Sequence, residues 1–185
     1  MPNPTQKYKV PARLLHWTMA VLVLAMVPVG FLMLNDSIAR ELRNLMFIAH
    51  KNTGVLLLLL IVARLLYRWR NPPNLEPVRL PALQAFAAHA THVALYGLLL
   101  IMPLSGYIRV RAGGFPIEGL DALGVPPLVP RSEALADFAQ AVHFYAGYGI
   151  AVFIALHVGA AAYHGLVCRD GIFSRMWPVF TREAN

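Results

Sequence analysis

The stretch FAQAVHFYAGYGIAVFIALHVGAAAYHGLVC, at residues 138–168, decides the fold class of this chain. It contains no Asp, Glu, Lys or Arg, and it is longer than the ~20 residues that a helix needs to cross a bilayer. Its apolar residues run almost continuously instead of alternating, which favours a helix over a strand of a membrane barrel. Three histidines, His143, His157 and His164, interrupt the run. The stretch therefore predicts a membrane helix with ionisable side chains inside it.

Three further apolar segments precede this stretch, and together they predict four spans. The spans cover about residues 14–34, 45–66, 82–108 and 138–166. The first is too long for the apolar part of a cleavable signal peptide, and no A-x-A-like site follows it. The chain is 58% hydrophobic and 14% charged, whereas soluble domains have ~25% charged residues. We therefore expect an all-α membrane protein, a four-helix transmembrane bundle formed by a single domain over residues 1–185.

The basic residues of the connections predict the orientation. One side of the membrane holds the N-terminus, the second connection and the C-terminus, with Lys7, Lys9, Arg13, Arg64, Arg68, Arg70, Arg79, Arg169, Arg175 and Arg182. The other side holds fewer, namely Arg40, Arg43, Lys51, Arg109, Arg111 and Arg131. The positive-inside rule then predicts that both termini are cytoplasmic. The net charge of +7 is expected to meet anionic lipid and not nucleic acid, because the basic residues form no stripe interleaved with aromatics.

Two connections and the cysteine content complete the outline. RNPPNLEP, at residues 70–77, has three prolines and is expected to be an ordered, non-helical crossing. Residues 109–133, rich in Gly and Pro, form the only long loop expected outside the membrane. The single cysteine, Cys168, excludes a disulfide within the chain and a Cys-rich metal site. Covalent haem attachment is excluded too, because no CxxCH motif occurs.

Histidines concentrate in or beside the predicted spans. They are His16, His50, His89, His92, His143, His157 and His164. Ionisable residues inside a membrane are costly and usually serve a function. A proton pathway normally has Asp or Glu beside the His, and a zinc site would be expected with an HExxH motif or cysteines; the spans contain neither. Haem iron takes neutral imidazole without a carboxylate, so haem explains the histidines best.

Spacing predicts which histidines act together. His143 and His157 are 14 residues apart on nearly the same helix face, and a rise of ~1.5 Å per residue separates them by ~21 Å along the axis. His16 begins the first span on the inner side, and His50 begins the second on the outer side. An antiparallel bundle therefore pairs His16 with His157 and His50 with His143. Two bis-imidazole haems, one in each half of the membrane, are expected.

Small residues support the same four positions. A porphyrin lying along a helix needs a small residue about one turn from its ligand, and the residues four positions after these histidines are Ala20, Gly54, Gly147 and Ala161. Gly54 and Gly147 are thus candidate haem-contacting residues, although small residues are common at any membrane helix interface. His164 and His92 remain alternatives to His157 as the inner ligand. His89 and His92 are expected to hydrogen-bond a haem propionate, a quinone or a neighbouring helix.

Several motifs resemble the bacterial cytochrome b561 family of integral di-haem membrane proteins. They are RLLHW at 13–17, HKNTG at 50–54 with the following ARLLYRWRNPP, HVALYGLLLIMPLSGY at 92–107, and VHFYAGYG with ALHVGAAAYHG in the last span. The resemblance covers nearly the whole chain in order and spacing. It implies two haem b groups held by His16, His50, His143 and His157, and electron exchange with membrane quinone. In HFYAGYG, Tyr145 and Tyr148 depart from the family pattern and are expected to tune or crowd the outer haem.

The expected function is di-haem electron transfer in a bacterial inner membrane, with no side chain acting as nucleophile or general base. Some members of the resembling family oxidise superoxide at the outer face and pass the electron to ubiquinone, and a redox protein or quinol is an alternative donor. Candidate hydrogen-bond donors to a quinone are His92, Tyr96 and His164. A His-rich proton-coupled transporter and a membrane anchor for a soluble redox partner are the competing hypotheses. The sequence leaves open the electron donor, the direction of flow, the haem potentials and the oligomeric state.

Overall fold

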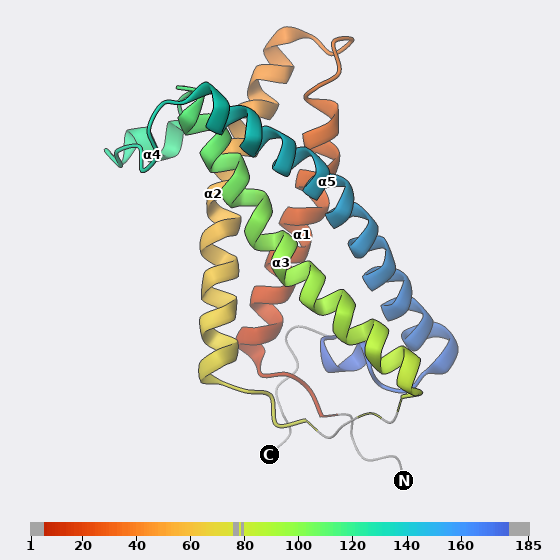
Figure 1. Cartoon of the computed structure of the whole chain (residues 1–185). Helices are drawn as coiled ribbons and strands as arrows, with labels where there is room; N and C mark the ends of the chain where they lie inside the picture. Colours follow the sequence, from red (N-terminus) through yellow and green to blue (C-terminus); the bar gives the residue numbers. More distant parts are fainter. Residues whose placement is uncertain (1–5, 76–77, 79, 178–185) are drawn as a thin grey trace.

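The computed structural model describes residues 6–75, 78 and 80–177. Four long helices dominate it: α1 (Val10–Leu32), α2 (Arg40–Arg70), α3 (Ala82–Ala112) and α5 (Glu133–Ala162), which a π-helical turn, Tyr163–Cys168, continues (Figure 1). All four are long and apolar enough to cross a membrane. No strand occurs among the described residues. The predicted all-α, four-helix membrane bundle is confirmed.

The helices differ from the predicted spans mainly at their ends. α2 begins at Arg40 and ends at Arg70, several residues beyond the apolar segment on both sides, and α3 continues to Ala112. Hydropathy locates only the apolar middle of a helix, whereas the hydrogen-bonded backbone continues into the polar interface. Arg68 and Arg70 lie in the last turn of α2, where cations interact favourably with the helix dipole. α1 ends at Leu32, slightly before the predicted end of the first span.

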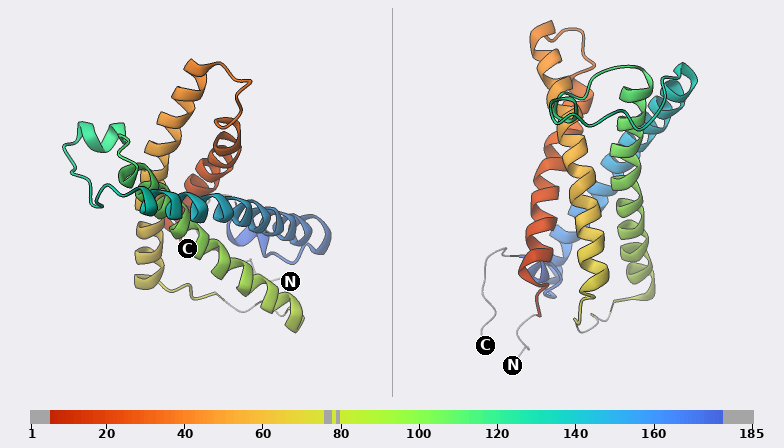
Figure 2. Two further views of the ribbon diagram at one scale, coloured as in Figure 1. Left: turned by 45° about the horizontal axis from the view of Figure 1, so that its top comes forward. Right: turned by 90° about the vertical axis from the view of Figure 1, so that its left-hand side faces the viewer.

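The helices pack closely only along part of their surface. α3 and α5 make the most extensive contact, and α2 packs against both α1 and α3 (Figure 2). The central apolar cluster consists of Met19 and Val23 from α1, Leu57 and Ile61 from α2, and Ile150 from α5. Only 6–11% of the most apolar window of each span is buried inside the bundle. Apolar side chains therefore cover the outside, as a lipid environment requires.

Both ends of the described chain meet at one end of the bundle (Figure 1). Tyr8 N–H donates to the carbonyl of Arg175 at 3.0 Å, and Trp17 Nε1–H donates to the carbonyl of Met176 at 2.9 Å. The α1–α2 connection and the short helix α4 (Glu118–Ala122) lie at the opposite end. Two basic residues used to predict the orientation, Arg79 and Arg182, lie outside the described residues.

The helix α4 was not expected, because residues 109–133 read as a loop rich in Gly and Pro. Its five residues are too few to produce a helical periodicity in the sequence. The crossing between α2 and α3 contains no helix among its described residues, in agreement with its prolines.

Candidate functional site

The first histidine pair joins α2 to α5 near the α4 end of the bundle. The ring centroids of His50 and His143 are 6.1 Å apart, and the ring planes are inclined by 77°. His143 Nδ1 lies 2.9 Å from the carbonyl oxygen of Met102 and 3.2 Å from Ser105 Oγ. A carbonyl can only accept, so Nδ1 carries the proton, and the lone pair of Nε2 is left available. Such a backbone acceptor commonly orients a metal-binding imidazole.

Two glycines that the sequence analysis did not single out provide room for these rings. A Cβ at Gly30 of α1 would lie 3.1 Å from His50 Cε1, and a Cβ at Gly106 of α3 would lie 3.1 Å from His143 Cε1. Both contacts are tighter than ordinary van der Waals distances, so each ring lies directly against a glycine backbone. The available signal was a glycine inside a membrane helix, which sequence alone does not link to a particular histidine.

The second histidine group joins three helices near the chain ends. The ring centroids of His16 and His157 are 6.1 Å apart, with an interplanar angle of 84°. His92 from α3 lies on the other flank, 5.4 Å from His157 between ring centroids. Trp17 packs against His16 at 5.5 Å. The structure therefore brings His16 and His157 together, as the spacing predicted, and adds His92 to the same group.

Exposure separates the seven histidines further. His16, His50, His143 and His157 are half-buried, whereas His89 and His92 on α3 are exposed. His164 lies beyond the second group on the final turn, where its Nδ1 is 2.5 Å from Asp170 Oδ2. His164 is half-buried too, but among the described residues it contacts Asp170 and no other histidine ring. The remaining four half-buried histidines form two pairs with equal ring separations, and those pairs are the candidate site.

The geometry of both pairs is compatible with a metal held between two imidazoles. A nitrogen–metal bond of about 2.0–2.1 Å on each side, plus roughly 1 Å from each nitrogen to its ring centre, gives centroids about 6 Å apart. The observed separation is 6.1 Å in both pairs. The donors are neutral imidazoles among apolar side chains, which suits haem iron. The donor set thus fits a bis-imidazole haem at each pair.

Gly54 and Gly147, the two glycines predicted to contact haem, are not required by the packing of the protein itself. A Cβ at Gly54 would meet no atom within 4 Å, and one at Gly147 would meet only Met102 Cε, at 3.9 Å. Their lack of side chains therefore leaves space beside His50 and His143 on the same helices.

Basic and aromatic side chains line a cleft near the second group. Arg64 donates to the carbonyl of Ala12 at 3.0 Å, and the guanidinium groups of Arg64 and Arg68 each lie 6.0 Å from the ring centre of Tyr96. Tyr8 and Met176 complete one wall of the same cleft. Guanidinium groups bind carboxylates well, so this cleft suits an anionic group of a ligand.

The α4 helix is held against α2 directly after His50, at Lys51 and Asn52. Lys51 Nζ donates to Glu118 Oε1 at 2.6 Å, and Asn52 donates to Glu118 Oε2 at 3.0 Å. Gly119 N–H donates back to Asn52 Oδ1 at 2.7 Å. Burial alone would raise the pKa of Glu118, but the hydrogen bonds from Lys51 and Asn52 outweigh it and hold this pKa below its usual range. Lys51 and Asn52, which belong to the HKNTG motif, thus position the helix α4.

The arginines near this end differ in their partners. Arg111 is buried and pairs with Asp121 at 2.6 Å, and this hydrogen bond keeps the pKa of the Asp121 carboxyl below its usual range. Arg109 donates to the amide oxygen of Gln140 at 3.0 Å. Arg131 donates to the carbonyl of Gly114 at 3.2 Å and lines an open cleft of about 280 Å³. Among the described residues, Arg109 and Arg131 have no carboxylate partner, so their charges are not neutralised.

Comparison with known proteins agrees with this architecture. Residues 7–179 match the family described as prokaryotic cytochrome b561. Cytochrome b561 homolog 2 of Escherichia coli is 33% identical over 177 residues, covering 94% of this chain and 93% of the relative. Cytochrome b561 homolog 1 of the same organism is 32% identical over 130 residues, covering 70% and 73%. The probable superoxide oxidase CybB of Yersinia pestis is 28% identical over 169 residues, covering 89% and 92%.

The chain belongs to the prokaryotic cytochrome b561 family. It is therefore a multi-pass bacterial membrane protein of a family that binds haem b and transfers electrons. This assignment favours electron transfer over the transporter and membrane-anchor hypotheses.

Proposed function

We propose that the chain binds two haem b groups and transfers electrons across the bacterial inner membrane to or from ubiquinone. The proposed iron ligands are His50 with His143 at the outer site and His16 with His157 at the inner site. The observation that supports this most directly is the equal centroid separation of 6.1 Å in both pairs. Haem bound at the two pairs supplies one-electron chemistry at two depths of the membrane.

The protein's own side chains have positioning tasks in this proposal. Met102 and Ser105 fix the tautomer of His143, and Gly106 sets the depth of its ring. At the inner site, Arg64 and Arg68 are suitable partners for haem propionates because they lie at the edge of the histidine group. Gly54 and Gly147 let a flat macrocycle approach α2 and α5 closely. The whole chain acts as one domain, and both termini face the cytoplasm.

Ubiquinone is the proposed exchange partner at the inner site. The side chain of His92 is exposed, and its ring lies 5.4 Å from His157. Its imidazole can donate a hydrogen bond to a quinone carbonyl that enters laterally from the bilayer. Tyr96 and His164 are further candidate donors on the same side. Tyr96 lies beneath two guanidinium groups.

Superoxide is the proposed electron donor at the periplasmic face. Two superoxide anions would be oxidised to dioxygen for each ubiquinone that takes up two electrons and two protons. The Yersinia pestis relative named as a probable superoxide oxidase supports this substrate. The charges of Arg109 and Arg131 support it further, since neither has a carboxylate partner among the described residues. A redox protein or quinol is the competing donor.

Reoxidation of the reduced protein tests the proposal. Purified protein, reduced anaerobically with a stoichiometric amount of dithionite, is mixed with a short-chain ubiquinone analogue while the haem absorbance is followed. We expect rapid return of the oxidised spectrum. His92→Phe, which keeps the aromatic shape but donates no hydrogen bond, is expected to slow the reaction without removing haem. Failure of the wild-type protein to be reoxidised would contradict the quinone assignment.

A further inference from the structure

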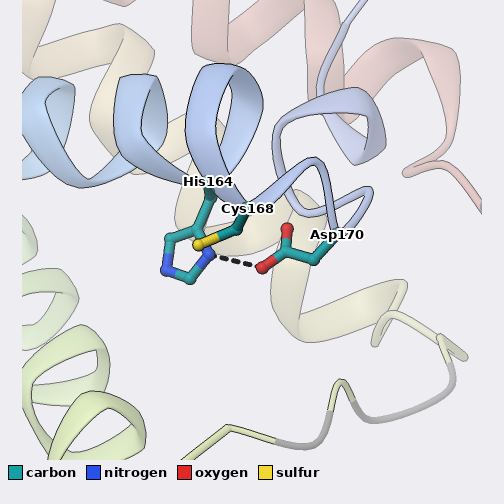
Figure 3. A group of neighbouring side chains, drawn as sticks. All are labelled: His164, Cys168 and Asp170. Atoms are coloured by element: carbon teal, nitrogen blue, oxygen red, sulfur yellow. Dashed lines mark hydrogen bonds and ion pairs between the residues drawn. The ribbon is translucent and has the colours of Figure 1, made fainter.

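We propose that His164, Cys168 and Asp170 form a binding site for a divalent transition-metal ion of the zinc type, separate from the paired histidines. Figure 3 shows the three side chains converging at the end of the last helix. An imidazole nitrogen, a thiol sulfur and a carboxylate oxygen all lie within 4.8 Å of one another. Zinc accepts this mixture of nitrogen, sulfur and oxygen donors, and sites with three protein ligands leave the fourth position to water.

The backbone brings the three donors to the same place. His164 and Cys168 are four positions apart in the π-helical turn Tyr163–Cys168, so they lie on the same side of it. Arg169 then takes a left-handed conformation, with φ 51° and ψ 36°, and ends the helix. The chain turns back, and Asp170 reaches His164. Ile172 N–H holds the other carboxylate oxygen of Asp170 at 3.1 Å.

Small adjustments would complete the coordination. Bonds of about 2.0–2.3 Å in a tetrahedral zinc site set the donor atoms roughly 3.3–3.8 Å apart. The His164 and Asp170 donor atoms, now 2.5 Å apart, must open by about 1 Å to reach that spacing. Cys168 is exposed and its side chain contacts the hydroxyl of Tyr163, so its sulfur must exchange this contact for the metal ion. The other two side chains are largely covered, with 14% and 25% exposed, and are already oriented toward one another.

The chemistry of binding is a ligand exchange without electron transfer. The ion takes Cys168 as the thiolate, the thiol proton leaves to solvent, and His164 binds as the neutral imidazole. In the proposed orientation this end of the bundle faces the cytoplasm, where cysteines stay reduced. Borderline-soft zinc is favoured over magnesium or calcium, because those hard ions prefer sites made only of oxygen.

Alkylation of the single cysteine tests the site. Intact full-length protein is treated with N-ethylmaleimide, with and without Zn²⁺, and the adduct is followed by mass spectrometry. Because Cys168 is the only cysteine in the chain, every adduct reports this position. We expect Zn²⁺ to slow alkylation roughly tenfold or more and Mg²⁺ to leave the rate unchanged. His164→Asn and Asp170→Asn should lose most of the protection, while His89→Asn, a matched change at an exposed histidine of α3, should keep it.

Two results would overturn the proposal: an alkylation rate that Zn²⁺ does not alter, or protection that survives in both His164→Asn and Asp170→Asn. The second would mean that the two residues only form an ion pair closing the helix end. If the asparagine variants do not fold, the milder Cys168→Ser decides the question by elemental analysis. Wild-type protein should retain about one more zinc per chain than Cys168→Ser, and equal zinc contents would refute the site.

Discussion

His143 of α5 holds its Nδ1 2.9 Å from the backbone carbonyl of Met102 in α3, while its ring faces His50 of α2. A single side chain thus links the two helices that pack most extensively, α3 and α5, to a third. The carbonyl removes rotational freedom from the imidazole and fixes the position of its proton. The packing of the three helices therefore positions the ring of His143 relative to His50.

Enlarging Gly106 should displace this ring. A Cβ there would lie 3.1 Å from His143 Cε1, so Gly106→Val is expected to destabilise the site by about 1–3 kcal/mol, as overpacking usually does. Haem occupancy measured after purification should fall. Gly97→Val is the matched control in the same helix, because a Cβ at Gly97 meets no atom within 4 Å. Equal occupancy in both variants would show that the glycine contact does not position the ring.

Enlarging Gly54 or Gly147 tests a different property. Neither position is crowded by the protein itself, so Gly54→Leu and Gly147→Leu should leave the helical content of the protein unchanged. If a macrocycle lies against these glycines, both variants should lose part of the haem absorbance at the outer site. Full occupancy with an unaltered spectrum would mean that the two glycines serve ordinary helix packing.

The sequence could predict the helices and the histidine pairs for different physical reasons. Four apolar segments of sufficient length determine four spans, because the bilayer leaves few alternatives for the backbone. Antiparallel topology then determines which histidines share a depth, and the rings of His16 and His157 do lie together. No such rule predicts which side chains of different helices lie side by side at the same depth. The position of His92 beside His157 depends on how α3 is rotated, which hydropathy does not encode.

Side-chain partners outside the spans were also beyond the sequence. In the sequence, Lys51 is a single charged residue in an apolar segment. In the structure, it forms an ion pair with Glu118 of α4. The charge balance of the sequence does not distinguish Arg109, Arg111 and Arg131 from one another. Of these three, Arg111 alone has a carboxylate partner among the described residues. Such pairings depend on the path of a loop whose glycines and prolines allow many conformations.

Acidification should release α4 from α2. The pKa of Glu118 is held below its ordinary value of 4.5, so its ionised form stabilises the docked helix above that value, and the contribution disappears as the pH falls through the lowered pKa. The side chain is partly exposed, so the effect is about 1 kcal/mol or less. The protection factors of the α4 amides, which correct exchange rates for the intrinsic pH dependence of amide exchange, should therefore fall at low pH. Glu118→Gln should have lower α4 protection factors at neutral pH and lose most of their pH dependence, and wild-type protection factors that do not change with pH would contradict the assignment.

Salt should slow reduction by superoxide if arginines attract the anion. Fields from exposed charges are screened over ~8–10 Å at moderate ionic strength. We expect stopped-flow reduction of the haem by superoxide to slow steeply between low and high salt. Arg131→Gln should lower the rate at low salt and flatten this dependence, since Arg131 lines the outer cleft. A salt-independent rate would remove arginine steering, and the absence of any reduction would leave a quinol or a protein donor.

The central claim is that His50 with His143 and His16 with His157 hold two separate haems. A pyridine haemochrome assay on purified wild-type protein, His143→Ala and His157→Ala tests it most directly. The account predicts about two haem b groups per chain in the wild type and about one in each variant. The native absorbance spectra of the two variants, recorded before pyridine is added, should differ because different sites remain. A wild-type protein with one haem or none would contradict the claim. So would a His157→Ala variant that keeps two haems while His164→Ala loses one.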